Sequence, residues 1–195
     1  IIIKLNKRFK ILVVDDHSSD DTPLLKREKI HYIRNSKQQG YEQSLINGFK
    51  FIIKYFKNAR YIVTFDADGE HSIRDLLKIQ NKKNNSKIDL LIGNRNRKNR
   101  IIEIIFSYYF NNFFKVKDPF SGLRAIKIFK LSKIINKLSN DKYLVDIIFY
   151  FFKNKFSIHN IDVNSKKRMG KSKVGGLISV YIKMIKIFIY FLNKN

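Results

Sequence analysis

The sequence predicts an α/β protein with a mostly parallel sheet flanked by helices. Segments rich in β-branched and aromatic residues alternate along the chain with helical segments, which is typical of α/β domains. Two predicted strands, at residues 10–14 and 61–66, run directly into closely spaced aspartates. Active groups of open α/β sheets gather at the carboxyl ends of the strands. A site rich in carboxylates is therefore expected at that edge of the sheet.

The composition is that of an ordered protein with a strong positive charge. A chain of 195 residues with 44% hydrophobic residues can bury a sizeable core. It has no cysteine, which excludes disulfides, thiolate metal sites and cysteine nucleophiles. Lys and Arg number 40 against 16 Asp and Glu, a net charge of +24. Such a charge favours an anionic partner: a nucleic acid, an anionic lipid or a phosphorylated substrate.

Hydrophobic periodicity predicts the elements in chain order. The segments with strand character are residues 10–14, 30–33, 61–66, 89–92, 123–129 and 157–163, with 61–66 expected at the centre. The segments with helical character are about four turns after Gly40 and residues 73–84, 101–115, 130–139, 143–154 and 176–192. Within 101–115, a thin polar stripe is formed by Glu103, Ser107 and Asn111. No internal repeat or linker interrupts the pattern, which predicts one domain at residues 1–175.

The last segment, residues 176–195, is predicted to be an amphipathic helix at a membrane surface. Its apolar run is shorter than the ~20 residues that a spanning helix needs. Ser179, Lys183, Lys186 and Tyr190 recur at helical spacing and form one polar stripe. A helix that is cationic on one side and apolar on the other suits an anionic membrane interface. Two alternatives stay open: a helix packed on the domain's own core, and a truncated transmembrane region.

The chemistry centres on Asp66 and Asp68, which follow the strand at 61–66. Two carboxylates one residue apart repel each other unless a cation or a proton lies between them. An all-oxygen pair suits Mg²⁺ or Mn²⁺, which keep waters and a substrate phosphate as further ligands. An Asx-rich turn that closes the strand is the alternative interpretation, and the Asp-x-Asp pattern alone does not decide between the two.

Several short motifs follow one another over most of the chain. They are Asp15-Asp16-His17-Ser18-Ser19-Asp20-Asp21-Thr22, Gly40 with Gly48, Asp66-Ala67-Asp68-Gly69-Glu70-His71, Gly93-Asn94-Arg95, Ser107 with Asn111, Asp118 through Arg124, and Gly170-Lys171-Ser172-Lys173. Their order and spacing resemble family 2 glycosyltransferases with the GT-A fold. The likeness is greatest to the branch similar to dolichyl-phosphate mannose synthase and other polyprenyl-phosphate glycosyltransferases.

The resemblance implies a role for residues in these motifs. The donor-nucleotide site would contain Asp15, Asp16, Asp66, Ala67, Asp68 and Arg95. The metal site, for Mg²⁺ or Mn²⁺, would contain Asp66, Asp68 and Glu70. The phosphates of donor and acceptor would be bound by Lys167, Arg168 and Lys173. The catalytic candidates are Asp118, Arg95 and Arg124.

The resemblance also implies a reaction and a location. The expected enzyme moves a sugar, with inversion, from a nucleotide-sugar donor to a polyprenyl (dolichyl-type) phosphate, at the cytoplasmic face of an anionic membrane. A metal ion and cationic side chains would stabilise the charge that develops on the leaving diphosphate. A lipid phosphate is already ionised and can attack directly. A sugar hydroxyl in surface-polysaccharide synthesis, the alternative acceptor, needs a carboxylate base, for which Asp118 and Asp146 are candidates.

Departures from the family pattern affect the donor site. The family opens with a strand that ends in a Pro-x-Tyr-Asn-Glu type motif, and this sequence has none. Because that strand is central to the family's sheet, its lack should expose strand edges and remove part of the donor pocket. Lys167 stands where the family has Arg, and Glu70 replaces the usual Gln. Two further hypotheses stay open: an inactive fragment, and a basic nucleic-acid-binding protein. No RRM or KH signature occurs, so nucleic acid is not the expected partner.

Overall fold

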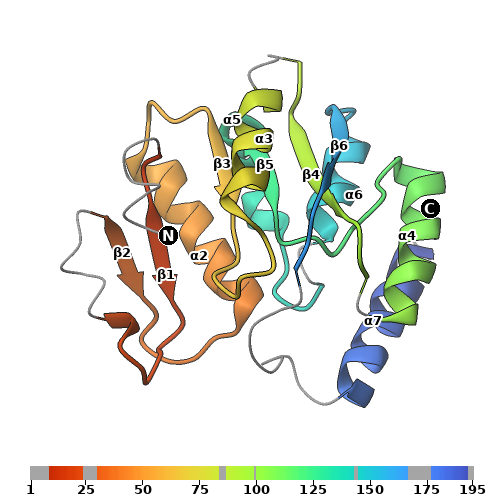
Figure 1. Ribbon diagram of the computed structural model, residues 1–195, viewed down its shortest axis with the longest axis horizontal. Coiled ribbons are helices and arrows are strands. Elements are labelled where there is room, and N and C mark those ends of the chain that lie inside the picture. Colours follow the sequence, from red (N-terminus) through yellow and green to blue (C-terminus); the bar gives the residue numbers. More distant parts are fainter. Residues whose placement is uncertain are drawn as a thin grey trace.

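The computed structural model describes residues 9–23, 30–83, 87–98, 100–142, 145–166 and 177–192. Its strands are β1 (Leu12–Asp15), β2 (His31–Arg34), β3 (Tyr61–Thr64), β4 (Leu90–Arg95), β5 (Arg124–Lys127) and β6 (Ile158–Val163). Its helices are α2 (Tyr41–Tyr55), α3 (Ile73–Lys83), α4 (Ile101–Phe114), α5 (Ile128–Ser132), the 3-10 helix η2 (Ile135–Lys137), α6 (Asp146–Lys153) and α7 (Leu177–Leu192). Each predicted strand has a counterpart, and the predicted α/β class is confirmed (Figure 1).

Four strands form one sheet in the order β3-β5-β4-β6. β4 and β6 are parallel, whereas β5 runs antiparallel to both β3 and β4. β3, β4 and β6 therefore point the same way, and their carboxyl ends lie at one edge of the sheet. The sequence predicts a central strand at residues 61–66. In the described part of the chain β3 is instead an edge strand, because β5 is the one strand that pairs with it.

β1 and β2 form a separate, parallel two-stranded sheet. Helix α2 packs against both sheets: a Cβ placed on Gly48 would lie 2.9 Å from Cγ2 of Val14 in β1. On the same helix, Ile46 and Phe49 share a buried cluster with Ile62 of β3. Among the described strands, β1 and β3 each leave one edge unpaired.

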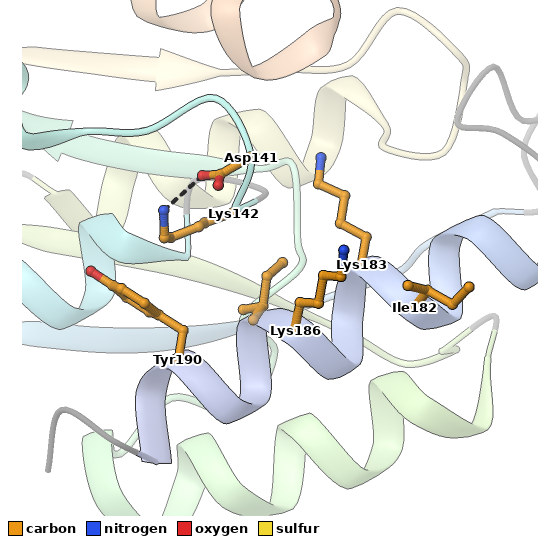
Figure 2. A pocket seen from close by; sticks show the side chains of 7 residues that line it. Asp141, Lys142, Ile182, Lys183, Lys186 and Tyr190 are labelled. Carbon is orange, nitrogen blue, oxygen red and sulfur yellow. Dashed lines mark hydrogen bonds and ion pairs between the residues drawn. The ribbon is translucent and has the colours of Figure 1, made fainter.

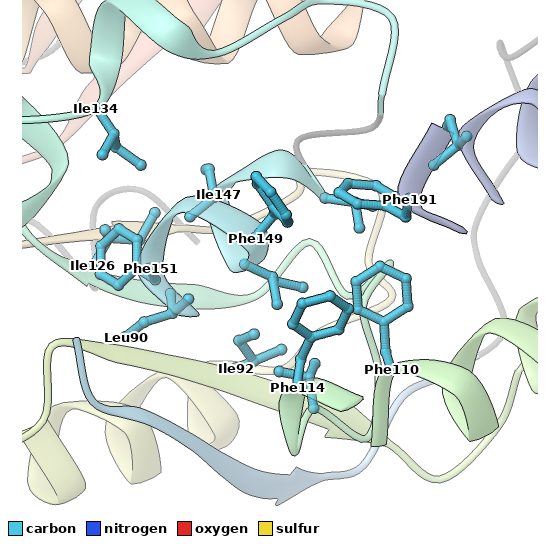
Figure 3. Packing of buried hydrophobic residues seen from close by; sticks show 14 of the residues in the cluster. Leu90, Ile92, Phe110, Phe114, Ile126, Ile134, Ile147, Phe149, Phe151 and Phe191 are labelled. Carbon is cyan, nitrogen blue, oxygen red and sulfur yellow. The ribbon is translucent and has the colours of Figure 1, made fainter. Parts of the chain in front are cut away.

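Two hydrophobic clusters cover the two faces of the four-stranded sheet. Alternate residues of β4 point to opposite faces, so Leu90 and Ile92 join the larger cluster and Leu91 joins the smaller one. The larger cluster contains buried aromatic side chains from α4, α6 and α7, among them Phe110, Phe149 and Phe191 (Figure 3). The smaller cluster contains Ile79 of α3, so helices cover both faces, in three layers.

One side of α7 packs on the rest of the domain. Met184, Ile187 and Phe191 are buried in the larger cluster. This contact corresponds to the core-packed alternative for the last segment, whereas the isoleucines on the outer side of the helix are exposed. Among the described residues, no helix is both long and apolar enough to cross a membrane. The division of the chain after residue 175 and the membrane-surface role of α7 stay predictions.

Candidate functional site

The carboxyl ends of β1 and β3 meet at the N-terminus of α2. After β1, Asp16 accepts hydrogen bonds from the backbone N–H groups of Gln39 and Gly40, each at 2.8 Å. After β3, Asp66 Oδ1 accepts a hydrogen bond of 3.0 Å from the hydroxyl of Tyr41. Gly40 has φ of 90°, which L-residues rarely adopt, so glycine is required where the chain enters α2. The acid-bearing strand ends thus lie together, as expected from the sequence.

Asp66 and Asp68 lie partly open to solvent at the end of β3. Both residues are half-buried, and Ala67 between them is exposed. A Cβ added to Gly122 would lie 1.9 Å from Asp66 Oδ2, so the carboxylate sits directly against the glycine backbone. Asp68 Oδ1 accepts the backbone N–H of Glu70 at 3.0 Å. This pair supplies only oxygen atoms, the donor set that Mg²⁺ and Mn²⁺ prefer.

Glu70 does not complete a metal site with the two aspartates. Its side chain is buried, and its Oε1 forms an ion pair of 3.1 Å with Arg95 Nη1. Across the described residues, no three or more His, Cys, Asp or Glu side chains gather in a group that can hold a metal. The metal site of three carboxylates predicted from the sequence is therefore corrected. Asp66 and Asp68 remain candidate ligands, whereas Glu70 is paired with Arg95.

Arg95 lies at the centre of a buried cluster of acids. It is 6% exposed; its Nε donates to Asp118 Oδ2 at 2.8 Å and its Nη2 to Glu103 Oε2 at 3.2 Å. Burial alone would lower the pKa of Arg95, but the carboxylates of Asp118, Glu103 and Glu70 outweigh burial and raise the pKa. Asp118 is itself 0% exposed. Arg95 and Asp118 bind each other in the interior of this structure, and the roles expected for them, diphosphate binding for Arg95 and catalytic base for Asp118, stay predictions.

Arg124, the third catalytic candidate, supports the turn beside Asp66. It is buried, and it donates to the carbonyl oxygens of Ser121 at 2.9 Å and Pro119 at 2.8 Å. Burial lowers its pKa. The same turn is tied to β3, because the hydroxyl of Thr64 donates to the Gly122 carbonyl at 2.6 Å. Arg124 thus positions the backbone against which Asp66 rests, and the structure does not present it to a substrate.

The side chains of Asp15 and Asp16 differ in their exposure to solvent. Asp15 is buried, accepting the Ser18 N–H at 2.8 Å and the Tyr32 hydroxyl at 2.5 Å. Burial would raise the pKa of Asp15, but the hydrogen bonds from Tyr32 and Ser18 lower it. Asp15 therefore shapes the loop after β1. Asp16 is half-buried, and of the two it is the better placed to contact a nucleotide.

Asp146, the other candidate base, is buried in the first turn of α6. Its Oδ2 accepts the backbone N–H of Ser139 at 2.8 Å, while its Oδ1 has no hydrogen-bond partner among the described residues. Burial raises the pKa of Asp146 to about 6. An acceptor hydroxyl must come within hydrogen-bond reach of its base, and in this structure neither Asp118 nor Asp146 is exposed.

The chain enters its basic segment next to the Asp68–Glu70 loop. The backbone N–H of Lys166 donates to the Glu70 carbonyl at 2.8 Å. One residue earlier, the Ser165 hydroxyl donates to Asn96 Oδ1 at 2.9 Å, which ties this segment to the end of β4. The predicted phosphate ligands lie outside the described residues: Lys167, Arg168 and Lys173. Their role stays a prediction.

A cavity of about 570 Å³ lies between α7 and the 141–142 segment. It is lined by Asp141, Lys142, Ile182, Lys183, Ile187, Lys186 and Tyr190 (Figure 2). Lys183 Nζ forms an ion pair of 2.5 Å with Glu42, in the first turn of α2 and next in sequence to Tyr41. Cationic and apolar groups therefore meet close to the helix terminus that contacts Asp66.

Sequence reasoning missed the partners that orient these groups. The contact between Tyr41 and Asp66 joins residues 25 positions apart, and no local pattern indicates it. Glu103 had a signal, because it belongs to the polar stripe on the helix at 101–115. The stripe did not indicate that Glu103 and Ser107 would be buried, nor that Glu103 would bind Arg95.

The fold and its acid-bearing strand ends define a class of protein, the GT-A glycosyltransferases. A solved structure of glucosyl-3-phosphoglycerate synthase from Mycobacterium tuberculosis, in complex with phosphoglyceric acid, is similar with a TM-score of 0.68 at 13% identity, covering 94% of this chain and 68% of that chain. The same enzyme in complex with Mn²⁺, uridine diphosphate and glucosyl-3-phosphoglycerate gives a TM-score of 0.66 at 13% identity, covering 94% and 68%. The sequence model of glycosyl transferase family 2 matches residues 2–128. The chain belongs to that family.

Curated relatives come from archaea. Two uncharacterized proteins of Methanocaldococcus jannaschii are 31% and 29% identical, covering 76% and 62% of this chain. The chain spans 65% and 61% of the length of these two relatives. The UDP-N-acetylglucosamine–dolichyl-phosphate N-acetylglucosaminyltransferase of Methanococcus voltae is 24% identical over 80% of this chain and 74% of that protein.

Proposed function

We propose that the protein transfers a sugar, with inversion, from a nucleotide-sugar donor to a polyprenyl phosphate at a membrane surface, with the help of Mg²⁺ or Mn²⁺. The observation that carries the proposal is the half-buried pair Asp66 and Asp68, at the strand end that meets the N-terminus of α2. Membership of glycosyl transferase family 2 supports the transferase activity. A similar fold crystallised with Mn²⁺ and uridine diphosphate supports the donor class and the metal.

The chain's own residues would hold the metal and orient its ligands. Asp66 and Asp68 would bind the ion, with the Tyr41 hydroxyl and the Gly122 backbone fixing the Asp66 carboxylate. When bound, the ion would supply positive charge to the leaving diphosphate. Asp16, half-buried at the end of β1 in the two-stranded sheet, would face the nucleotide from the other side of the α2 N-terminus.

Burial of the candidate bases supports a phosphate acceptor. Asp118 binds Arg95 in the interior, and Asp146 is buried with a raised pKa. A lipid phosphate needs no base, because it is already ionised at neutral pH and requires mainly binding and orientation. One relative is named for transfer to dolichyl phosphate, which is consistent with this acceptor. The cavity with Lys142, Lys183 and Lys186 beside apolar side chains offers suitable chemistry for an amphiphilic phosphate.

A transfer assay tests the proposal. The protein is incubated with polyprenyl phosphate in vesicles, Mn²⁺ and one labelled donor at a time: UDP-glucose, UDP-N-acetylglucosamine or GDP-mannose. We expect label from one donor to enter the organic phase, and we expect EDTA or Asp68→Ala to abolish the transfer. The matched control, Asp162→Ala, removes an exposed carboxylate on β6 and should leave transfer intact.

The distribution of label separates the alternatives. If label is transferred to an added glycerate or oligosaccharide and never to lipid, the acceptor is a hydroxyl group and not a lipid phosphate. A folded protein that moves label to no acceptor, with any donor, would contradict transferase activity of this chain.

A further inference from the structure

Helix α4 buries two polar side chains and exposes a row of apolar ones over its first eight residues. Of the polar stripe residues, Glu103 and Ser107 are buried and Asn111 is exposed, and Glu103 binds Arg95. Over the first eight residues of the helix the outward residues are apolar or aromatic: Ile101 (73% exposed), Ile104 (56%), Ile105 (54%) and Tyr108 (74%), whereas Asn111 and Asn112 are exposed near its C-terminal end. Glu103 is the one charged residue in the sequence of this helix. A helix face in water is normally polar, so the outward face of α4 is unsuited to water.

Helix α7 extends this apolar surface. Figure 1 shows α4 and α7 side by side, and the Tyr109 and Phe188 rings, one from each helix, lie 5.0 Å apart. Residues three or four positions before a helical residue share its side, so Ile105 flanks the contact on α4 and Ile185 flanks it on α7. The outward isoleucines of α7 are about half exposed: Ile182 (49%), Ile185 (49%) and Ile189 (51%). We call these seven exposed side chains the outer α4–α7 face.

Exposed lysines follow α4 and lie on α7, and none of the seven residues of this face is acidic. Lys115 and Lys117 follow α4 and are exposed, and Lys186 is exposed on α7. The sequence of α7 contains no Asp or Glu. Apolar side chains between lysines match the layering of a bilayer surface, where anionic headgroups lie above acyl chains.

We propose that the outer α4–α7 face lies in the interface of an anionic membrane. At about 1.5 Å per residue, the 14 residues of α4 extend about 21 Å, less than the ~30 Å apolar core of a bilayer, so the helix would lie along the surface. A second copy of the chain is a poorer occupant, because it would bring the same charge of +24. The inference deepens the proposed function and partly rests on it, yet membrane binding is measurable without any transfer.

Vesicle flotation tests the assignment. The chain and its triple variant Ile101→Ser, Ile104→Ser, Ile105→Ser are mixed with vesicles of phosphatidylcholine, with or without phosphatidylglycerol. We expect the unchanged chain to float with the anionic vesicles and less at high salt. The triple variant should partition roughly tenfold or more weakly, because it loses apolar area from the interface. The matched control, Tyr55→Ser with Phe129→Ser, removes exposed rings elsewhere and should float like the unchanged chain.

Other results of these measurements would contradict the membrane assignment or the proposed function. Equal flotation of the triple variant and the unchanged chain would contradict the assignment to this face, as would failure of the unchanged chain to float. If light scattering showed a dimer of the unchanged chain, a monomer of the triple variant and no vesicle binding, the face would instead be an interface between copies of the chain. Metal-dependent donor binding, measured on the same proteins, reports on the proposed function separately: its loss with flotation retained would overturn only that function.

Discussion

Replacing Arg95 by methionine should lower the free energy of unfolding by about 3–5 kcal/mol, because breaking a buried ion pair leaves uncompensated charge in the interior. Arg95 contacts the carboxylates of Glu70, Glu103 and Asp118 at 2.8–3.2 Å. Methionine has a similar length and no charge, so the substitution tests the charge more than the packing. Chemical denaturation followed by circular dichroism measures the change.

The control for this prediction is Arg100→Met. Arg100 pairs with Glu103 at 3.0 Å, but its side chain is 22% exposed and Glu103 keeps its contact with Arg95. Its loss should cost about 1 kcal/mol or less. If Arg95→Met were as stable as Arg100→Met, the acid cluster would not be a structural centre. Arg95 would then again be a candidate for binding the diphosphate.

Substituting Gly122 by alanine should abolish metal-dependent donor binding with little loss of stability. The added Cβ would lie 1.9 Å from Oδ2 and 2.7 Å from Cγ of Asp66, so that carboxylate must rotate away. All the atoms that the new methyl group meets within this range belong to one side chain, so the backbone need not move. Titration of donor with Mn²⁺ measures the binding, and denaturation measures the stability.

Gly93→Ala is the comparison for this substitution. A Cβ there would meet the Leu123 carbonyl oxygen at 3.2 Å, so it would strain the adjoining backbone without touching Asp66 directly. It should lower stability more than Gly122→Ala does and retain donor binding. Full donor binding by a folded Gly122→Ala variant would show that the Asp66 carboxylate is not needed where the structure places it.

The sequence predicts the helices and strands well, and it also predicts that acidic side chains gather at the carboxyl ends of strands. Both features depend on local sequence pattern. Short runs of β-branched, aromatic and aliphatic residues mark β3 and β4, and parallel strands place their carboxyl ends together. The aspartates Asp66 and Asp68 accordingly lie partly open at a strand end, close to Asp16.

The directions of the charged side chains were not predictable in the same way. Arg95, Asp118 and Glu70 stand in motifs of the family, and position in a motif does not reveal whether a charge faces a substrate or another charge. Here the long-range fold brings the three together, across 23 and 25 residues of sequence. Similarly, the polar stripe on the helix at 101–115 does not reveal that Glu103 lies buried against Arg95, because the sequence pattern does not specify which charge a buried carboxylate will meet.

The most direct test of a metal-dependent donor site at Asp66 and Asp68 is calorimetric titration of the donors into the protein. UDP-glucose, UDP-N-acetylglucosamine and GDP-mannose are each titrated with Mn²⁺ and with EDTA, into the unchanged chain and into Asp68→Ala. A metal-dependent donor site at the end of β3 predicts that one donor binds, and that both EDTA and Asp68→Ala abolish the binding. Donor binding that persists in EDTA or in Asp68→Ala, or no binding of any donor to a folded chain, would contradict that site.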